Sequence, residues 1–395
     1  MPRICIIAHN SFGAMTGGRC GHVGGAEHQT ALLARWMAGK GFPTSLLTWD
    51  EGQADNTVID GVRVIKMCGP GQGLPGVRFF HPRLSSLYAA MKRADASVYY
   101  HNSAEYVTGL AAAWCRRHGR KFISSVASDV ACDSALPALR KSYERILYRY
   151  GIRHADRLIV QTNRQQKMLR DGFGLESVVL PMPCPGPSAS QLTVVAPARP
   201  PQIAWVGRLV ELKRLEWLLT AAERLPQVNF RVVGATNADN AYARAMLERG
   251  RALSNVMWAG TVAREGMPEI YQRASGLCCT SIYEGFPNTF LEAWSHGRPV
   301  ITSVDPDGVV ARLNLGWVAR SVDELVEAIN ALLNSPDQWR EKSSNGRRYY
   351  LENHELTVAM PRFEQELAAM GRAIGLRAMT VAAPACAASS PPTSQ

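Results

Sequence analysis

The sequence lacks any run of about eighteen apolar residues, so no segment is long enough to cross a bilayer as a helix. It also lacks the layout of a signal peptide, because residues 4–8 near its start already have the pattern of a buried strand. Charged residues are sparse, 19% against 46% hydrophobic, which is typical of a soluble enzyme with a large core. We expect a cytoplasmic protein.

The cysteines form no C-x-x-C pair, and there is an odd number of them. The nine are scattered over positions 5, 20, 68, 115, 132, 184, 278, 279 and 386. This arrangement supports neither a disulfide framework nor a zinc site, so we expect reduced cysteines in the core. His9, His22, His28 and His101 also have no Cys or acidic partners at ligand spacing. We therefore expect no metal and no other cofactor.

Acidic residues are fewer than basic ones, 33 against 44, which gives a net charge of +11. The excess favours anionic partners such as nucleotide diphosphates, lipid-phosphate acceptors or an anionic membrane face. No recognised nucleic-acid-binding module accompanies the charge, so nucleic acid is not an expected partner.

A chain of 395 residues is too long for one ordinary core and predicts two domains. Short strands alternate with helices such as 106–117 and 138–150, which predicts a doubly wound parallel sheet whose functional loops lie at the carboxyl ends of its strands. The expected strands are 44–49, 62–67, 97–100, 121–126 and 157–161.

Proline-rich sequence at 181–187 and 198–201 is the clearest linker in the chain. We place an N-terminal domain at 1–185, the linker at 186–201 and a C-terminal domain at 202–356. Further helices are expected at 323–333, 338–351 and 357–374. Residues 379–395, rich in Ala, Ser and Pro, have little to bury and are expected to be disordered.

Residues 281–299 hold two carboxylates between two apolar strands, 274–280 and 300–303. Asn288 is positioned to cap a helix that starts at Thr289 and ends at Gly297. Glu292 lies about 200° around this helix from Phe290 and is free to face a cleft. Glu284 precedes the helix, whose unpaired N–H groups favour an anion. A phosphate beside these carboxylates suggests a sugar nucleotide, and the alternative is a solvated acidic pair at a helix start.

A second candidate anion site follows the linker. The strand 203–209 contains Gly207 and Arg208, and Lys213 precedes the helix 215–225. Arginine binds a diphosphate as a fork and lysine as a point charge, so this pair is a candidate diphosphate site. The alternative is ordinary surface charge at a strand end.

Two glycine-rich segments also resemble ligand loops. Gly24 and Gly25 precede a helix and would let the backbone approach a ligand, or they form a plain flexible turn. Gly71, Gly73 and Gly76 satisfy G-x-G-x-x-G, but proline interrupts the motif and no helix pattern follows it. The dinucleotide interpretation therefore lacks its structural context.

Glu284 and Glu292, with Gly285 and Phe286 after the first, resemble the signature of retaining glycosyltransferases of the GT-B fold, family 4 (group 1). The resemblance covers most of residues 1–375 and implies an α/β fold of two Rossmann-like domains that face each other across a cleft. It implies that Glu284 contacts the donor sugar and Glu292 the ribose of the nucleotide. The same resemblance brings the backbone of the intervening loop close to the diphosphate and sugar: Gly285, Phe286, Pro287, Asn288 and Thr289.

The resemblance extends to the other motifs. It implies that Gly207, Arg208 and Lys213 bind the donor diphosphate. Gly24, Gly25 and Glu27 match a G-G-x-E segment that lies in the cleft, near the donor phosphate or the acceptor. The loop after a later strand would contact the base, through Gly260, Thr261 and Val262.

One expected residue is missing. The family commonly has a histidine in the loop after a strand like 121–126, proposed to act near the reacting sugar, and this chain has Ser128 and Asp129 there. Either Asp129 makes the polar contact, or His101 occupies the space.

A basic amphipathic pattern lies within 138–150. Lys141, Arg145 and Arg149 recur every four residues, with Tyr143 and Ile146 between them. Such a helix rests on an anionic membrane or holds an anionic acceptor, unless it is simply a solvated basic face.

The function implied is transfer of a sugar from a nucleotide-diphosphate donor to a hydroxyl of a saccharide or lipid-linked acceptor. The resemblance implies retention at the anomeric carbon, metal independence and a place in polysaccharide or glycoconjugate synthesis. Peripheral contact with the cytoplasmic membrane face fits the charge. The rival interpretations are a sugar-nucleotide epimerase or phosphorylase of the same fold, and a non-catalytic subunit that binds sugar nucleotides.

Overall fold

The computed structural model describes residues 1–18, 24–188, 192, 200–235 and 240–381, and of 372–381 the backbone alone. An eight-stranded sheet forms the N-terminal half, in the order β3-β4-β2-β1-β5-β6-β7-β8. Every pair in it is parallel except β3 with β4. Its strands are β1 Ile4–Ile7, β2 Thr44–Thr48, β3 Thr57–Ile59, β4 Val62–Lys66, β5 Val98–Asn102, β6 Lys121–Val126, β7 Arg157–Val160 and β8 Val178–Val179.

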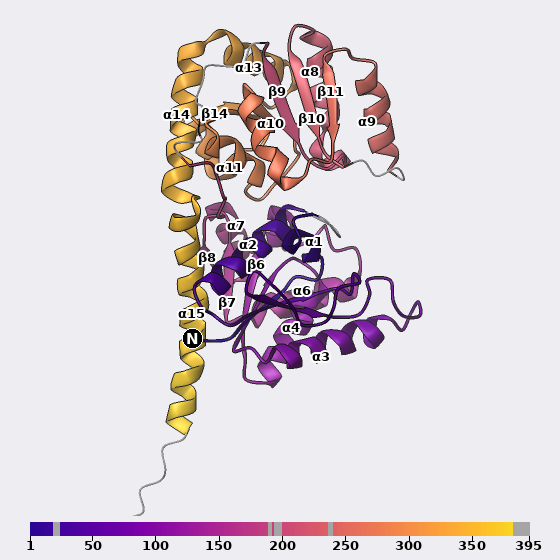
Figure 1. Ribbon diagram of the computed structural model, residues 1–395, viewed down its shortest axis with the longest axis vertical. Helices are drawn as coiled ribbons and strands as arrows, with labels where there is room; N and C mark the ends of the chain where they lie inside the picture. The colour runs from indigo at the N-terminus through magenta and orange to yellow at the C-terminus, as the bar shows by residue number, and fades with distance from the viewer. Residues whose placement is uncertain (19–23, 189–191, 193–199, 236–239, 382–395) are drawn as a thin grey trace, which may run out of the picture.

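A second, six-stranded parallel sheet has the order β11-β10-β9-β12-β13-β14 and stands above the first in Figure 1. Its strands are β9 Gln202–Val206, β10 Asn229–Val233, β11 Val256–Gly260, β12 Gly276–Cys279, β13 Val300–Thr302 and β14 Gly316–Val318. This is the doubly wound architecture that the alternation of strand and helix predicts. The two sheets are also the pair of Rossmann-like domains that the resemblance to the GT-B fold implies. The apolar strand pattern predicts the sheets well because parallel strands are buried on both faces.

Helices separate most consecutive strands in both halves, whereas β2, β3 and β4 follow one another with no helix between them. The N-terminal half contains α1 Phe12–Met15, α2 Gly25–Gly39, α3 Ser85–Ala94, α4 Tyr106–Arg117, α5 Asp129–Cys132, α6 Ser142–Arg153 and α7 Asn163–Phe173, with a π-helical segment Phe79–Leu84 before α3. The C-terminal half contains α8 Leu215–Arg224, α9 Ala241–Arg251, α10 Met267–Arg273, α11 Asn288–Ser295, α12 Val309–Arg312 and α13 Val322–Asn334. Short 3-10 turns lie at Glu211–Lys213, Arg264–Gly266 and Pro306–Gly308.

The strand order reverses between β1 and β5 in the first sheet and between β9 and β12 in the second. Ligands of open parallel sheets bind outside the carboxyl ends of the strands at such switch points, because the loops diverge there. The loops after these four strands are therefore the expected place for a bound ligand.

Two consecutive helices, α14 Pro336–Asn353 and α15 Leu356–Val381, form a column beside both halves (Figure 1). Met360, Phe363 and Leu367 of α15 are buried in the core that contains β1, so the C-terminal helix returns to the first domain. It is longer than the predicted 357–374 and includes residues 379–381 of the predicted tail. Residues 382–395 lie outside the described residues.

Two smaller predictions concern the start of helix α6 and the state of the cysteines. Helix α6 begins at Ser142 rather than at residue 138, because the Arg145 side chain donates to Leu139 O at 2.6 Å and closes a turn before the helix. The seven described cysteines are free and buried; Cys20 and Cys386 lie outside the described residues. Within the described part of the chain, no helix is long and apolar enough to span a membrane.

Helices α4 and α6 pack so closely that a side chain would not fit between them. A Cβ atom added at Gly109 would lie 2.2 Å from Leu147 O. Gly109→Ala is expected to lower the free energy of unfolding by about 1 to 3 kcal/mol, the usual cost of overpacking a core. Gly39→Ala is the control, since an added Cβ there meets nothing within 4 Å. Chemical denaturation of both variants measures the difference, and equal stability would contradict this packing.

Candidate functional site

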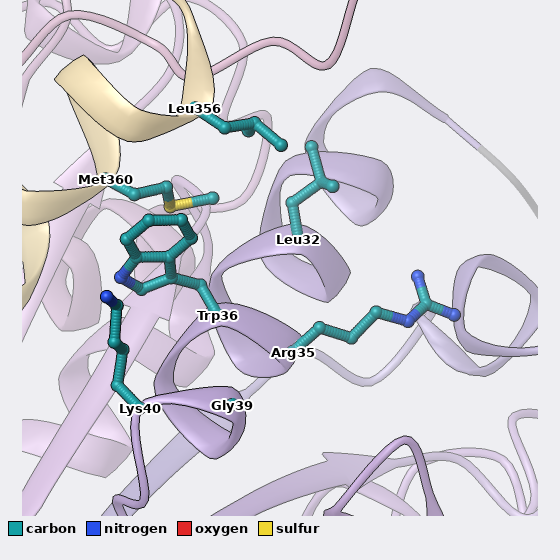
Figure 2. Close-up of a pocket in the computed structure, with 7 residues that line it drawn as sticks. All are labelled: Leu32, Arg35, Trp36, Gly39, Lys40, Leu356 and Met360. Atoms are coloured by element: carbon teal, nitrogen blue, oxygen red, sulfur yellow. The ribbon is translucent and has the colours of Figure 1, made fainter.

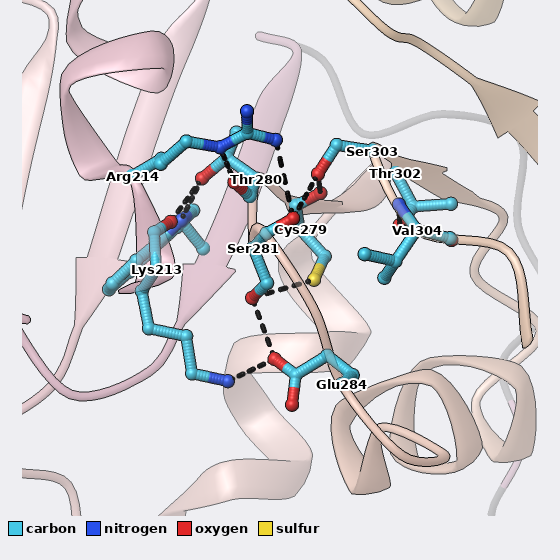
Figure 3. A network of polar contacts seen from close by, with 10 residues as sticks. Lys213, Arg214, Cys279, Thr280, Ser281, Glu284, Thr302, Ser303 and Val304 are labelled. Atoms are coloured by element: carbon cyan, nitrogen blue, oxygen red, sulfur yellow. Dashed lines mark hydrogen bonds and ion pairs between the residues drawn. The ribbon is translucent and has the colours of Figure 1, made fainter. Parts of the chain in front are cut away.

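Lys213 and Glu284 form an ion pair at the carboxyl edge of the second sheet (Figure 3). Lys213 ends the 3-10 turn that follows β9, and Glu284 lies in the loop that follows β12. Ser281 Oγ donates to the same carboxylate oxygen at 2.6 Å. The structure thus brings together one predicted cation and one predicted carboxylate from the two sides of the switch point.

Hydrogen bonds hold these two loops against each other. Thr280 Oγ1 donates to Lys213 O at 2.7 Å, and Arg214 Nε donates to Thr280 O at 2.8 Å (Figure 3). Ser303 Oγ, at the end of β13, donates to Ser281 O at 2.7 Å. The positions of the Lys213 ammonium and the Glu284 carboxylate are therefore set by backbone contacts and not by their own attraction alone.

Arg208 lies at the same edge, two residues beyond β9, and its side chain is exposed. This side chain forms no hydrogen bond or ion pair with any described residue, so its guanidinium is available to an anion. Gly207 before it donates its backbone N–H to Val233 O at 3.0 Å. A Cβ on Gly234 would lie 1.9 Å from Gly207 O, so glycine at 234 allows this close approach of the two strand ends.

The prediction that Glu292 is free to face a cleft is wrong. The residue is only 8% exposed and does not face an open cleft. Arg264 donates to its Oε1 and the Tyr271 hydroxyl to its Oε2, both at 2.5 Å. Burial raises the pKa of Tyr271 well above its usual value, and the adjacent Glu292 carboxylate raises it further.

Arg264 and Tyr271 were missed at the sequence level. No spacing rule links them to Glu292, because the three residues lie on different elements. Arg264 is in the turn after β11, Tyr271 is in α10 and Glu292 is in α11. Gly260, Thr261 and Val262, the predicted base contacts, form the start of that same turn, and Thr261 is exposed. The turn thus reaches from β11 toward Glu292.

The sequence predicts that Asn288 caps α11, and this prediction is wrong. The helix begins at Asn288 itself, with Pro287 before it and no side-chain cap. The Asn288 side chain instead accepts a hydrogen bond from Gln29 Nε2 of α2 at 2.9 Å. Glycine at 25 allows this approach, since an added Cβ there would lie only 2.7 Å from Asn288 Nδ2. The start of α2 and the start of α11 therefore meet across the domain boundary.

The loop after Glu284 also contacts the first domain. Phe286 N donates to Gln161 Oε1 at 3.0 Å, and a Cβ at Gly285 would lie 2.2 Å from Ala127 O. Glycine is required at 285 because the two backbones approach so closely. Of the remaining loop residues, Pro287 is buried and Thr289 is half-buried.

Asp129, at the start of α5, lies on the first-domain side of this contact. Its carboxylate accepts from Gln165 Nε2 at 3.1 Å and lies 3.3 Å from Arg164 Nε. Burial raises the pKa of Asp129; Gln165 and Arg164 partly offset this, whereas the charge of Glu284 adds to it. The predicted carboxylates 129 and 284 therefore lie on the two sides of the close contact between Gly285 and Ala127.

His101 occupies a different place, at the switch point of the first sheet. It is 1% exposed, its Nδ1 lies 2.8 Å from Ile7 O, and its Nε2 lies 3.4 Å from Glu105 Oε1. His9, after β1, lies 3.6 Å from the other oxygen of Glu105. Burial raises the pKa of Glu105, but His9 and His101 outweigh this and lower it to about 2.

This histidine and glutamate cluster was not predicted as a unit. His9 follows β1 and His101 lies in β5; the two strands are adjacent in the sheet, but the two histidines are more than ninety residues apart in the chain. Glu27, of the G-G-x-E segment, is close enough to raise the pKa of His9, although burial lowers it overall. Within the described residues, no three His, Cys, Asp or Glu side chains are arranged as metal ligands.

A pocket of about 400 Å³ lies elsewhere, between α2 and α15 (Figure 2). Leu32, Trp36, Leu356 and Met360 give it a largely apolar wall. Trp36 lies eleven residues beyond the start of α2, or roughly 16 Å along the helix axis. The pocket therefore does not include the polar groups described above.

Comparisons with known proteins agree with this geometry. Residues 24–185 match the family described as glycosyl transferase 4-like domain, and residues 200–335 match glycosyl transferases group 1. The chain belongs to the group 1 glycosyltransferases. In this group 1 glycosyltransferase, the first match covers the Asp129 and His101 side and the second covers Arg208, Lys213 and both glutamates.

Two curated relatives of this group 1 glycosyltransferase have named activities. An MMP alpha-(1->4)-mannosyltransferase of Mycolicibacterium hassiacum is 30% identical over 162 residues, which is 38% of each chain. A D-inositol 3-phosphate glycosyltransferase of Mycobacteroides abscessus is 26% identical over 337 residues, 76% of this chain and 74% of the relative.

Two solved structures share its fold. A sucrose-phosphate synthase from Thermosynechococcus elongatus has a TM-score of 0.77 at 18% identity, covering 94% of this chain and 100% of that one. The Anabaena protein HepE, solved in complex with UDP and glucose, has a TM-score of 0.73 at 15% identity, covering 93% and 100%.

Asp129→Asn tests the role of the first-domain carboxylate. Because the pKa of Asp129 is raised, its ionised form costs the native state free energy, and this cost appears as the pH rises through the ordinary Asp range. The variant should thus melt no lower than wild type at pH 7, yet lose roughly tenfold to hundredfold in turnover, as expected for a lost hydrogen bond to a charged group. Thermal melting at acidic and neutral pH, with kcat at pH 7, measures both effects.

Asp133→Asn is the matched control, because the Asp133 carboxylate accepts a hydrogen bond only from the nearby Ala135 N among the contacts described for it. It should keep its turnover. Normal turnover in Asp129→Asn would remove Asp129 from the reacting site.

Proposed function

We propose that this protein transfers a sugar from a nucleotide-diphosphate donor to an acceptor hydroxyl with retention, in polysaccharide or glycoconjugate synthesis. One observation carries the proposal: Lys213 pairs with Glu284 at the switch point of the second sheet, and the exposed Arg208 side chain at the same edge has no partner among the described residues. Cations for a diphosphate and a carboxylate for sugar hydroxyls are thus adjacent.

Arg208 and Lys213 would neutralise the leaving diphosphate. Its negative charge grows as the bond to the sugar breaks, so preorganised cations stabilise the transition state more than the ground state. Because these side chains supply positive charge, we propose that no metal ion is needed for this step. Metal ions play the same part in other phosphate chemistry.

Glu284 would orient the donor sugar. Lys213 and Ser281 both bind one carboxylate oxygen, Oε1, and the second oxygen has no partner among the described residues. That second oxygen accepts hydroxyl hydrogens without competing with the ion pair. The starts of α2 and α11, which meet at Gly25 and Asn288, add unpaired backbone N–H groups for the diphosphate or sugar.

Glu292 would bind the ribose through one carboxylate oxygen while Tyr271 stays bonded to the other. Tyr271 is buried and holds Oε2, whereas the Arg264 side chain on Oε1 is 34% exposed and comes from a turn near the predicted base contacts. We propose that Arg264 shifts toward the nucleotide when the ribose hydroxyls take its place on Glu292. Gly260, Thr261 and Val262 then contact the base.

The acceptor would enter from the first domain. Asp129 lies across from Glu284, and the His9, His101 and Glu105 cluster lies at the switch point of the first sheet. These groups suit the hydroxyls of a saccharide or lipid-linked acceptor. One relative is named a D-inositol 3-phosphate glycosyltransferase, and inositol phosphate carries several hydroxyls.

Arg208→Ala tests the diphosphate role. The variant is expected to lose about 2 to 4 kcal/mol of transition-state stabilisation, or roughly 30-fold to 1,000-fold in kcat, as when other charge-stabilising donors are removed. Arg224→Ala is the control, since Arg224 is exposed in the same domain and pairs with Asp323. Steady-state kinetics with a glycosyl donor measure the loss. Wild-type turnover in Arg208→Ala would rule out the role.

A thermal-shift panel of nucleotide sugars, with and without EDTA, tests donor use and metal independence. A donor at a hundred times its Kd should stabilise the protein by about 2.7 kcal/mol, and EDTA should not change this. Loss of the shift in EDTA would contradict metal independence.

Product analysis separates the rival functions. Sugar conversion or phosphate dependence without an added acceptor would indicate an epimerase or phosphorylase. Tight donor binding without transfer or slow hydrolysis would indicate a non-catalytic subunit. Inversion at the anomeric carbon, read by NMR, would overturn retention alone.

A further inference from the structure

An exposed apolar surface lies on the first domain, built from two segments that are far apart in the sequence. The loop before α3 contributes Leu74, Val77 and Phe80, which are 73%, 55% and 65% exposed. The start of α6 contributes Tyr143 and Ile146, which are 41% and 65% exposed. We call these five residues the apolar face. They make up nearly half of the large hydrophobic side chains that the described chain exposes to this degree.

Aromatic contacts join the two segments into one surface. The ring of Phe79 lies 5.2 Å from that of Phe80 and 5.5 Å from that of Tyr143. It also lies 5.5 Å from the ring of Tyr106, the first residue of α4. Helices α3, α4 and α6 gather on the side of the first domain away from α15 (Figure 1).

The loop holds its apolar side chains outward in a defined conformation. Every residue from 71 to 78 is exposed, yet Arg83 donates to Pro70 O at 2.9 Å and Gly69 N to Gln72 Oε1 at 3.0 Å. A Cβ at Gly73 would lie 2.5 Å from the Pro82 ring, so the loop folds back tightly on the segment before α3. A rigid loop loses little entropy when it is buried against a partner.

Positive charge surrounds the apolar face. Residues 61–94 contain six cations and no acidic residue. Arg78, Arg140 and Lys141 are exposed beside the apolar residues, and the Lys141 ammonium lies 5.7 Å from the Tyr143 ring. Residues 1–185 hold 23 basic and 13 acidic residues, a net +10 of the total +11. The charge of the protein is thus concentrated in the domain that carries the apolar face.

We propose that this face binds the surface of an anionic lipid bilayer. Exposed Leu, Val, Ile and Phe side chains gain free energy in the acyl boundary, while Arg and Lys pair with anionic headgroups. Nucleic acid would explain the cations but not the exposed aliphatic side chains, since a phosphate backbone offers them nothing to bury against. The exposed apolar side chains and the positive charge around them therefore both fit an anionic membrane.

The position of the face suggests what the contact is for, and this step rests on the proposed function. Tyr106 directly follows Glu105 of the cluster at the switch point of the first sheet. A lipid-linked acceptor whose chain stays in the bilayer would present its sugar or headgroup to that edge. The membrane contact would then deliver acceptor without a separate carrier.

Vesicle co-sedimentation of the full chain tests the contact. The protein should bind vesicles of equal parts phosphatidylcholine and phosphatidylglycerol, bind phosphatidylcholine alone weakly, and dissociate at high salt. Arg78→Gln with Lys141→Gln should weaken binding roughly 25-fold, at about fivefold for each cation. Leu74→Ser with Phe80→Ser and Ile146→Ser should abolish binding at physiological salt.

Matched controls alter the second domain. Met257→Ser with Leu351→Ser removes apolar side chains that are 42% and 43% exposed, and Arg251→Gln with Arg320→Gln removes two exposed cations. Both controls should bind vesicles as wild type does. All variants should retain the wild-type melting temperature and donor-induced shift, which separates a failed membrane contact from a failed glycosyltransferase.

Three results would overturn the proposal. Equal binding to neutral and anionic vesicles, or none to either, would exclude recognition of an anionic bilayer. Unchanged vesicle binding in the serine variant would show that the apolar face is not the membrane contact. A dimer in solution that the serine variant dissociates, without vesicle binding, would instead assign the face to a second copy of the chain.

Discussion

The approach of the Glu284 loop to the first domain depends on the absence of a side chain at residue 285. Any Cβ there would collide with Ala127 O and crowd the Gln161 and Gln165 amides. Because glycine occupies the position, Phe286 N reaches Gln161 and the carboxylate of Glu284 comes within electrostatic range of Asp129. Polar groups of both domains therefore lie on either side of one contact.

The remaining polar groups are arranged around that contact according to what each must do. Glu284 shares one oxygen with a lysine and a serine and keeps the other available, whereas Glu292 is buried and saturated by Arg264 and Tyr271. Tyr271 holds one oxygen of this buried carboxylate in place, and in the proposed function the ribose replaces only the partly exposed Arg264 on the other oxygen. A half-exposed ion pair rearranges more easily when a charged ligand arrives.

The two domains also divide the charge. In the second domain basic and acidic residues nearly balance, and two of its cations, Arg208 and Lys213, lie close together in the chain after the end of β9. The first domain carries almost the whole net charge of the protein, spread over a surface that includes exposed apolar side chains. A point site suits a small anionic donor, and a broad field suits a large anionic surface.

The sequence by itself determined the architecture. Apolar runs such as 121–126 coincide with a strand of the structure, and α4 has the predicted bounds 106–117, because burial on both faces leaves a local pattern. It also determined which motif residues to examine, since Arg208, Lys213, Glu284 and Asp129 come to the carboxyl edges of the two facing sheets.

Only the tertiary structure decided how these residues are paired. Asn288 contacts Gln29 instead of capping its helix, Glu292 is covered by Arg264, and His101 joins His9 on Glu105. Each of these contacts joins different elements of the fold, and the first crosses between the domains. Local periodicity cannot encode such contacts, because they depend on how loops that are distant in the sequence pack after the sheets have formed.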